Sequence, residues 1–417
     1  MKLDLAIIGA GASGFMCACY LAFLKKSGAV PEDFSFVLIE RNSRPGKKLL
    51  LTGSGRCNLT NVSASYKDYN CDAPDRLKKI LDAFTPDDCL LFLEKELGLS
   101  YINKEDLIYP ATQRSATVLD AFRFYLADNG VKIISDTKVN SIKKYSDSYL
   151  LQTEDETSDL SFDRIVIATG GLSYPKTGSD GSGLVINPSI LKSNIITPDP
   201  ALVPLTSPDK DIRKLSGTSV SCRLSTSIEN KSYSEEGTLL FTDYGISGIC
   251  VMILSGHLIS YAREKGRYPD VYVDFLSKFS REEAEREIRT RLKSFSRRNL
   301  IDALSGLLRN NVIDLVIKRL AIAKDIKAED LNDDHIRRLV SELKAFKIRI
   351  NGNTGFDNSQ VTRGGIKLSD LDDDLCFGDK VYYCGEIVNV DGPCGGFNLQ
   401  WAWSSAVTVA RAIGGSI

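Results

Sequence analysis

The chain has 417 residues, which at about 150 residues per domain is enough for two or three domains with a sizeable core. Its 53 lysine and arginine residues are balanced by 54 aspartate and glutamate residues, and this balance excludes a global basic field for nucleic acid or an anionic membrane. Ten scattered cysteines without a Cys-x-x-Cys pair, and only two histidines, argue against zinc and against a disulfide scaffold. We therefore expect no metal, no nucleic-acid partner, and a reducing, cytoplasmic location.

The N-terminal segment predicts a strand, a glycine turn, a helix and a second strand. The uncharged stretch from Leu5 to Leu24 is long enough for a signal peptide or a membrane span, but Gly9, Gly11 and Gly14 interrupt it. We expect no membrane segment here. The predicted elements are a strand over Leu3–Ile8, a helix over Ser13–Lys26 and a strand over Phe34–Ile39. This βαβ order predicts an α/β fold with a doubly wound, Rossmann-like sheet.

The remaining pattern predicts a nucleotide-binding domain built from both chain ends. Further elements are helices over about Asp75–Leu97 and Ser115–Asn129, and strands over Lys132–Ile134, Lys138–Lys144, Ser148–Thr153 and Arg164–Ala168. From about 190 the sequence alternates as in antiparallel strands, with a helical region over Arg281–Lys324. A buried strand over Val381–Cys384 and a helix over Phe397–Ile413 close the chain. We predict one domain from 1–190 and 351–417, and an insert over 191–350 with a helical part at about 280–330.

The glycine turn after the first strand has the spacing of a dinucleotide-binding motif. Gly9, Gly11 and Gly14 form G-x-G-x-x-G between a strand and a helix, where Gly11 lets the backbone approach a pyrophosphate. The helix amino end then favours the phosphate charge. Glu40 ends the second strand, and we expect its carboxylate to accept hydrogen bonds from ribose hydroxyls. A turn that serves packing alone is the alternative.

Two later glycine-rich segments extend this predicted site. Ala168-Thr169-Gly170-Gly171 ends one buried strand, and Gly385-Glu386 follows another. Asp391 to Gly396 then leads into the closing helix. This arrangement resembles the glutathione-reductase-like superfamily of FAD proteins. The resemblance implies that Glu386 binds the ribityl chain and that amides near Asn398 and Leu399 face the pyrimidine edge of the flavin.

Longer motifs resemble one particular family over nearly the whole chain. They are Gly46-Lys47-Lys48-Leu49-Leu50-Leu51-Thr52-Gly53-Ser54-Gly55-Arg56-Cys57-Asn58-Leu59-Thr60-Asn61, Ala168 to Gly178, Gly395 to Ser405, and in the insert Leu215-Ser216-Gly217 and Leu240 to Gly245. The chain is similar to the YhiN/BaiN-like flavoproteins, also called the aminoacetone oxidase family of FAD-binding enzymes. This implies FAD as cofactor and an inserted β-barrel with a small helical piece.

The resemblance and the glycine motifs together define a predicted set of cofactor-binding residues. We expect Lys48 and Arg56 to be the charged neighbours of the flavin, where a cation stabilises the anionic reduced ring. The full set is Gly9, Gly11, Ala12, Ser13, Gly14, Glu40, Arg41, Lys47, Lys48, Gly53, Arg56, Cys57, Asn58, Val139, Ala168, Thr169, Gly170, Gly385, Glu386, Asp391, Gly396, Asn398 and Leu399.

The chain also departs from the family pattern, and these departures concern the substrate. Asp243 stands where the family usually has histidine before Tyr-Gly, and Ile249 replaces a proline after Ser-Gly. Asp180-Gly181-Ser182-Gly183 replaces Gly-Asp-Gly-Tyr, and Asp373-Asp374-Leu375-Cys376 replaces Thr-Met-Glu-Ser-Lys. FAD binding tolerates such changes. Substrate identity and any step that uses the histidine do not follow from the resemblance.

Few residues invite a catalytic interpretation, and no general base is assigned. Cys57 lacks the Cys-x4-Cys partner of disulfide reductases, so packing is the simpler role. His257 and His335 lie outside every motif. Candidate substrate contacts are Tyr174, Asp243 and Tyr244, with a hairpin turn without chemistry as the alternative for the last two.

The sequence thus predicts an FAD-dependent oxidoreductase that exchanges a hydride at flavin N5 with a small organic molecule. One alternative is a structural or redox-sensing FAD with the insert as a protein-binding module. Another, tRNA modification, is disfavoured by the charge balance. No second strand–G-x-G-x-x-G–helix unit is present, so NAD(P)H enters only as a transient electron donor without a domain of its own. Substrate, reaction direction and oligomeric state stay open.

Overall fold

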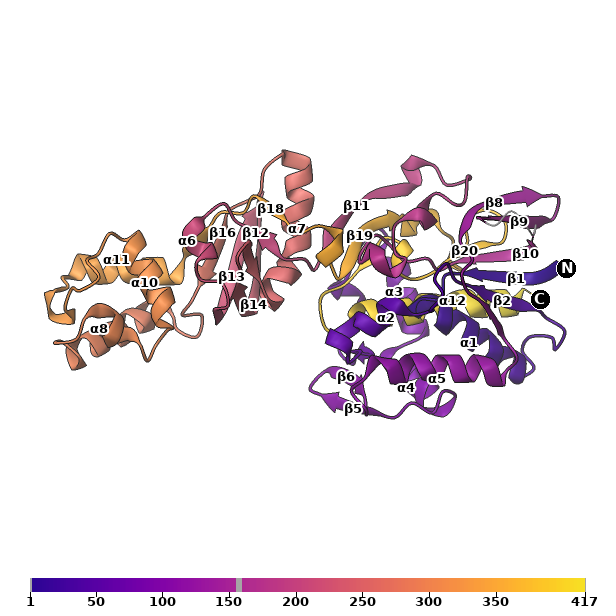
Figure 1. Ribbon diagram of the computed structural model, residues 1–417, viewed down its shortest axis with the longest axis horizontal. Coiled ribbons are helices and arrows are strands. Elements are labelled where there is room, and N and C mark those ends of the chain that lie inside the picture. The colour runs from indigo at the N-terminus through magenta and orange to yellow at the C-terminus, as the bar shows by residue number, and fades with distance from the viewer. Residues whose placement is uncertain (1, 155–159, 417) are drawn as a thin grey trace. The chain divides into compact units, whose positions relative to one another are not determined.

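The computed structural model describes residues 2–154 and 160–416, and the chain divides into two compact units (Figure 1). The first unit is Met1–Pro200 with Ser359–Ile417, and the second is Ala201–Asn358. Each has its own hydrophobic core. The second unit therefore begins and ends later than the predicted insert of 191–350. The reason is that β11 (Ile195–Ala201) pairs with β19 (Val361–Ile366), which ties both segments to the first unit.

A seven-stranded sheet forms the centre of the first unit. Its order is β7-β2-β1-β10-β9-β8, and β20 also pairs with β10. The strands β7, β2, β1, β10 and β20 are parallel, whereas the β8–β9 hairpin is antiparallel to the first half of β10. The bounds are β1 Lys2–Ile8, β2 Phe36–Ile39, β7 Lys132–Ile134, β8 Val139–Tyr145, β9 Ser148–Thr153, β10 Leu160–Ile167 and β20 Val381–Tyr383. Two strands therefore pair with the same edge of β10: β9 along its first half and β20 along its carboxyl half.

Helices and small sheets complete the first unit. The helix α1 is buried from Ser13 to Ala22 because small and apolar side chains cover all its faces there, and it packs against α12. The α-helices of the first unit are α1 Ala12–Lys26, α2 Lys47–Leu51, α3 Pro74–Ala83, α4 Pro86–Lys95, α5 Ser115–Asp128 and α12 Phe397–Gly415. The small sheets pair β3 (Thr60–Asn61) with β6 (Leu107–Pro110), β6 with β5 (Tyr101–Lys104), and β21 (Val390–Asp391) with β4 (Asn70–Cys71).

The second unit contains an antiparallel sheet followed by a group of helices. The sheet order is β17-β16-β13-β14-β15-β12-β18. Within the described residues no pairing joins β17 to β18, so closure into a barrel stays a prediction. Its strands are β12 Leu205–Thr206, β13 Ser219–Ile228, β14 Lys231–Phe241, β15 Gly245–Ser247, β16 Val271–Asp274, β17 Phe346–Ile348 and β18 Gly352–Asn353. Its helices are α6 Lys210–Arg213, α7 Ile249–Lys265, α8 Arg281–Ser294, α9 Leu300–Leu304, α10 Asn310–Arg319 and α11 Asp333–Lys344.

Several predicted helices have different bounds in the structure. The predicted helix over 75–97 is wrong as one element, because Thr85 caps a new helix and Pro86 occupies its first turn. The predicted region over 281–324 consists of α8, α9 and α10, and the sequence reading missed both α7 and α11. No helix within residues 2–154 and 160–416 combines the length and apolar character needed to cross a bilayer.

The cap of α4 gives a first testable prediction. The Thr85 hydroxyl accepts a hydrogen bond from the Asp88 amide at 3.2 Å, and the Asp88 carboxylate accepts one from the Thr85 amide at 2.9 Å. Thr85→Ala removes the acceptor for the Asp88 amide, so we expect a loss of about 1 kcal/mol in the free energy of unfolding. Thr85→Ser keeps the hydroxyl and is the matched control. Denaturant unfolding measures both, and equal losses in the two variants contradict the capping argument.

Candidate active site

The carboxyl ends of the parallel strands bring three glycine-containing turns to one edge of the sheet. The Ala168 amide donates to the Ile8 carbonyl at 2.8 Å, and the Cys384 amide donates to the Ile167 carbonyl at 3.2 Å. The chain therefore leaves β1, β10 and β20 at neighbouring points. Ligands of open α/β sheets bind outside this edge. The residues at 9–14, 168–171 and 384–386, which are far apart in the sequence, meet there.

The first turn is shaped by glycines that have different neighbours. A Cβ placed on Gly9, whose φ is +105°, would lie 2.6 Å from the Ala168 carbonyl oxygen. A Cβ on Gly14 would lie 1.9 Å from the Gly9 carbonyl oxygen. For Gly11, in contrast, no described atom lies within 4 Å of that position. Gly9 and Gly14 are thus required by packing, whereas Gly11 borders open space at the start of α1.

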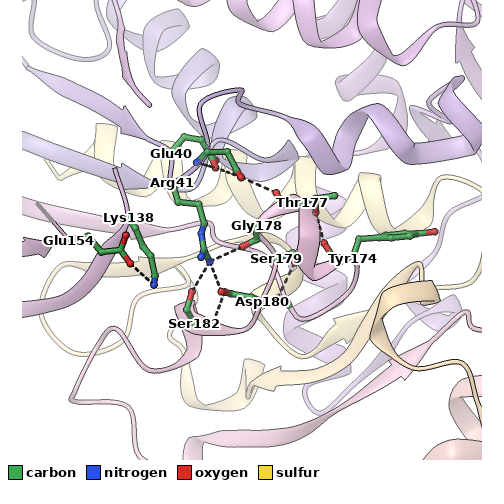
Figure 2. A network of polar contacts seen from close by, with 12 residues as sticks. Glu40, Arg41, Lys138, Glu154, Tyr174, Thr177, Gly178, Ser179, Asp180 and Ser182 are labelled. Carbon is green, nitrogen blue, oxygen red and sulfur yellow. Dashed lines mark hydrogen bonds and ion pairs between the residues drawn. The ribbon is translucent and has the colours of Figure 1, made fainter. Parts of the chain in front are cut away.

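Glu40 is fixed at the end of β2 beside this turn (Figure 2). It is 7% exposed, and its Oε2 accepts a hydrogen bond from the Ala10 amide at 2.9 Å. Its Oε1 accepts from the Asn42 amide at 2.8 Å and from Asn42 Nδ2 at 2.7 Å. Lys47 Nζ donates to Asn42 Oδ1 at 3.0 Å. These bonds orient the buried Glu40 carboxylate toward the first turn. Asn42, which supplies two of them, was missed by the sequence analysis.

A segment after the second turn lies against the end of β2 (Figure 2). Arg41 pairs with Asp180 at 2.6 Å, and Asn42 Nδ2 donates to the Thr177 carbonyl at 3.0 Å. Partial burial alone raises the pKa of Asp180, but hydrogen bonds from Ser182 and Arg41 outweigh it and lower that pKa. Asp180 therefore stays ionised beside Arg41. Its partner could not be read from the sequence, because 139 positions separate the two residues.

Glu386 is held by groups from two other elements. Lys48 of α2 forms an ion pair with its Oε2, and the Thr362 amide of β19 donates to its Oε1 at 2.8 Å. The Thr362 hydroxyl in turn accepts from the Leu172 amide at 2.7 Å. The predicted pair of a cation and an acid at this edge, Lys48 and Glu386, is thus brought together. Thr362 was missed because it lies outside the quoted motifs.

Asp391 is also paired, but with residues that the sequence analysis did not consider. Arg363 donates to it through Nη2 at 2.9 Å and through Nε at 3.1 Å. Asn70 Nδ2 donates to Asp391 Oδ1 at 2.9 Å. Asp391 is 3% exposed, and the bidentate hydrogen bonds from Arg363 offset the free-energy cost of burying its carboxylate. The contact sets the position of β21, directly before the turn that leads into α12.

Like α1, helix α12 starts without a side-chain cap from the described residues. Gly396 precedes it with a φ of +95°, and a Cβ there would lie 2.5 Å from the Thr60 carbonyl carbon. The Asn398 side chain does not point outward. It accepts from the Gly392 amide at 2.9 Å and donates to the Gly392 carbonyl at 2.8 Å. Only the backbone of Asn398 and Leu399 is therefore available for the predicted role toward a flavin.

The loop after α2 has an unusual backbone. Gly53, Ser54, Gly55 and Cys57 all have φ between +56° and +83°. Cys57 is fully buried, and burial raises the pKa of its thiol to about 11, although a hydrogen bond with Thr52 opposes this. A protonated, enclosed thiol suits packing rather than redox chemistry. In the same loop Arg56 is exposed, with its guanidinium 5.6 Å from the Tyr109 ring centroid.

The other predicted residues occupy three different places. Val139 begins β8, two residues after Thr137, whose amide donates to the Glu40 carbonyl at 2.9 Å. Tyr174 follows the second turn with a φ of +55°, and Figure 2 shows its ring pointing away from the Arg41–Asp180 contact. Asp243 and Tyr244 are exposed in the turn between β14 and β15 of the second unit. Their role as substrate contacts stays a prediction.

The residues at the sheet edge fit an FAD cofactor. Asn58 Oδ1 and Thr169 Oγ1 are buried and have no hydrogen-bond partner in the described part of the chain. Buried polar atoms of this kind need a partner, and a ligand with many donors and acceptors supplies one. The amide ends of α1 and α12, both without a side-chain cap, suit a pyrophosphate and an electron-rich flavin edge. Within the described residues no cluster of metal-ligating side chains occurs.

This fit gives a prediction about Gly11. Its φ is −89°, and no described atom approaches its Cβ position, so Gly11→Val is compatible with the apoprotein fold. The added methyl groups occupy the open space where a pyrophosphate would approach. We expect the purified variant to lack FAD while its apoprotein melts at the same temperature as the unmodified apoprotein. Gly11→Ala should bind FAD with intermediate affinity. A Gly11→Val protein that purifies yellow with one FAD per chain would falsify this placement.

Comparison with known proteins agrees with the geometry. Residues 3–412 match the family described as HI0933-like protein Rossmann domain. The 3-dehydro-bile acid delta(4,6)-reductase of Clostridium scindens is 30% identical over 413 residues, which is 98% of each chain. The ribosomal RNA dihydrouridine synthase of Haemophilus influenzae is 29% identical over 416 residues, 98% of this chain and 97% of that one. The 3-ketosteroid delta1-dehydrogenase of Sterolibacterium denitrificans shares the fold over 100% of both chains, with a TM-score of 0.53 and 11% identity. The chain therefore belongs to the HI0933-like Rossmann family of YhiN/BaiN-like flavoproteins and is an FAD-dependent oxidoreductase.

Proposed function

We propose that this enzyme reduces a carbon–carbon double bond conjugated to a carbonyl group in a small organic substrate. The observation that carries the proposal is the chemistry shared by two relatives that match over nearly their whole lengths. One is named a delta(4,6)-reductase of 3-dehydro-bile acids, and the other a synthase of dihydrouridine in ribosomal RNA. Both names describe saturation of a double bond that is conjugated to a carbonyl.

The sheet edge supplies what such a reaction needs from the protein. Bound FAD supplies a hydride from N5 of its reduced ring. In this proposal Gly11 and the amino end of α1 bind the pyrophosphate, and Glu40 binds the adenosine ribose. Lys48 and the amino end of α12 lie toward the flavin, where positive charge stabilises the reduced ring. Glu386, held by Lys48 and Thr362, orients the ribityl chain.

The protein must also supply a proton and bind the carbonyl oxygen. Hydride addition to the β-carbon places negative charge on that oxygen, and the α-carbon then takes up a proton. Tyr174 is the donor that we assign to this task. Its left-handed φ of +55° is costly for a bulky residue, and such strain concentrates at functional sites. Its carbonyl oxygen accepts from the Thr177 hydroxyl at 2.7 Å, which helps to hold this backbone.

Two arginines of the second unit that RNA phosphates could contact are already paired with acids. RNA binding requires several lysine or arginine side chains free to neutralise phosphates. On α8, Arg289 pairs with Glu285 at 2.7 Å and with Asp333 at 2.6 Å, and Arg291 pairs with Glu287 at 2.6 Å. These arginines are therefore already neutralised by acids. RNA remains the second candidate because the relative from Haemophilus influenzae carries that name.

A direct experiment separates these substrates. The holoenzyme is reduced anaerobically with dithionite and mixed in turn with a 3-oxo-4,6-diene steroid and with an unmodified ribosomal RNA transcript. We expect the steroid dienone to restore the oxidised flavin absorbance and to gain two hydrogen atoms by mass spectrometry. Reoxidation by RNA alone assigns the second candidate. If neither class of acceptor reoxidises the flavin, the proposed reaction is wrong.

The role of Tyr174 gives a separate prediction. Tyr174→Phe removes only the hydroxyl, so FAD content and the backbone around residue 174 should be unchanged. We expect the rate of flavin reoxidation by the accepted substrate to fall about 10²-fold, the usual contribution of a general acid. The matched control is Tyr145→Phe, whose side chain is 69% exposed on β8. An unchanged rate in Tyr174→Phe would remove this residue from the chemistry.

The electron donor is proposed to be NAD(P)H acting transiently at the flavin. Within the described residues the Rossmann turn at 9–14 is the one bordered by open space and a buried acid, and FAD uses it. We therefore expect reduction of the bound flavin by NADPH to be slow and to increase almost linearly with concentration. Anaerobic stopped-flow mixing with NADH and NADPH measures this. Fast reduction that saturates at low micromolar NADPH contradicts the expectation.

A further inference from the structure

Two buried cysteines join strand β13 to helix α7 inside the second unit. In the β13–β14 ladder Cys222 lies directly opposite Gly237, so both positions face the same side of the sheet. A Cβ placed on Gly237 would lie 3.6 Å from the Cβ of Cys250. Cys250 therefore lies against the sheet at the position that faces Cys222 across the ladder. Both thiols are enclosed, with Cys222 2% exposed and Cys250 0% exposed. Each thiol is the largest influence on the pKa of the other.

The two thiols have different environments. Cys250 is the second residue of α7, a helix that follows Gly248 without a side-chain cap in the described chain. The neighbouring Cys222 thiol, together with the amides of Val251 and Cys250, outweighs burial and lowers the pKa of Cys250. The Cys250 thiol and burial raise the pKa of Cys222. A cysteine at a helix amino end with a second cysteine beside it is the arrangement of a reactive and a resolving cysteine.

The charged groups around Cys222 and Cys250 do not remove this difference between the pKa values of the two thiols. Glu235 on β14 opposes ionisation of Cys250, but its effect is smaller than that of Cys222, and burial raises the pKa of Glu235 itself. Asp274 on β16 acts on Cys222 and is neutralised by Lys344 at 2.6 Å. All eight other cysteines lie in the first unit, and burial raises the pKa of each of them: Cys17, Cys19, Cys57, Cys71, Cys89, Cys376, Cys384 and Cys394.

We propose that Cys222 and Cys250 form a redox-responsive dithiol that hydrogen peroxide converts to a disulfide, fastening the start of α7 to β13. The Cys250 thiolate attacks one peroxide oxygen, the O–O bond breaks, and the departing hydroxide takes up the proton released by Cys250 to become water. The Cys222 sulfur then displaces hydroxide from the Cys250 sulfenic acid, and that hydroxide leaves as water with the Cys222 proton. Two thiols are oxidised and one peroxide is reduced to two waters. A dithiol reductant reverses the reaction by exchange.

Peroxide is the oxidant that suits the site, because the thiols are enclosed and only a small neutral molecule reaches them without unfolding the unit. The resulting bond closes a loop of residues 223–249, which contains the part of β13 after Cys222, all of β14 and all of β15. Its effect is local to the second unit. It does not depend on which substrate the flavin site reduces, so this proposal and the proposed function fail independently.

Peptide mapping of the full-length holoenzyme tests the proposal without any variant. The protein is treated with one equivalent of hydrogen peroxide, alkylated with N-ethylmaleimide and digested with trypsin without reductant. Cys222 lies in the tryptic peptide 215–223 and Cys250 in the peptide 232–263, and neither peptide contains another cysteine. We expect these two peptides to be joined and to separate after dithiothreitol. Cross-links among other cysteines, with Cys222 and Cys250 alkylated, overturn the proposal.

Two single variants test the roles of the sulfurs. In Cys222→Ser the sulfenic acid on Cys250 cannot be resolved, so dimedone added together with denaturant after the peroxide treatment should label residue 250. In Cys250→Ser the remaining Cys222 should stay unlabelled. Equal labelling of both variants, or labelling of Cys222 alone, contradicts the assignment of Cys250 as the reactive thiol. Cys394→Ser, in the first unit, should form the same cross-link as the unmodified chain.

Hydrogen–deuterium exchange reports whether the bond fastens the helix. We expect the amides in the first turns of α7 to exchange more slowly in the oxidised protein than in the reduced protein, while α8 is unchanged. Exchange in α7 that is the same in both forms, despite a confirmed cross-link, would refute the fastening effect.

Discussion

The contact between helix α1 and the end of strand β1 is the constraint on which the candidate site depends. A side chain at Gly14 would collide with the Gly9 carbonyl, and one at Gly9 would collide with the Ala168 carbonyl, so the backbone itself forms these contacts. Because β1 is hydrogen-bonded to β2 on one side and to β10 on the other, this packing also sets where Glu40 and the second turn lie relative to the start of α1. The open space beside Gly11 follows from it. A strand that must pack this closely cannot carry large residues at the turn, which leaves the volume that the proposed FAD would occupy.

Ion pairs fix the positions of the later turns. We infer that they serve to place these turns more than to raise the free energy of unfolding. Asp391 is almost fully buried, and removing Arg363 alone would leave an uncompensated charge, a loss of roughly 3–5 kcal/mol in comparable proteins. Replacing such a pair by apolar residues is often neutral for stability, so folding alone does not require it. Here the pair holds β21 against β19 and β4, directly before α12 begins. The Lys48–Glu386 pair does the same for α2 and the turn after β20. We interpret both pairs as devices that orient the edge of the flavin site.

The sequence predicted those elements whose conformation is set by neighbouring residues in the chain. The strand, glycine turn and helix at the N-terminus follow from hydrophobic period and from glycine, and the structure has them at Lys2–Ile8 and Ala12–Lys26. The helix α7 was missed because its first turns are apolar at almost every position, which hides the helical period. The break at Thr85 was missed although Thr85 and Asp88 form a recognisable capping box. Partners such as Arg363 for Asp391, or Asp180 for Arg41, could not be read from the chain, because only the sheet topology brings them together. The predicted site residues themselves stay predictions about FAD, even where the structure gathers them at one edge.

The way in which the chain leaves and re-enters the first unit explains why a large insert is tolerated there. The strand β11, which ends at Ala201 where the second unit begins, pairs with β19, which starts three residues after the second unit ends at Asn358. Gly364 allows this pairing to be close, since a Cβ there would lie 2.8 Å from the carbonyl oxygens of Ile196 and Thr197. The two points where the second unit is attached are therefore held together by the first unit itself. Because each unit also buries its own apolar cluster, the host does not need the insert to close its core. An insert attached in this way can change in sequence, including at Asp243 and Ile249, without disturbing the turns at the sheet edge.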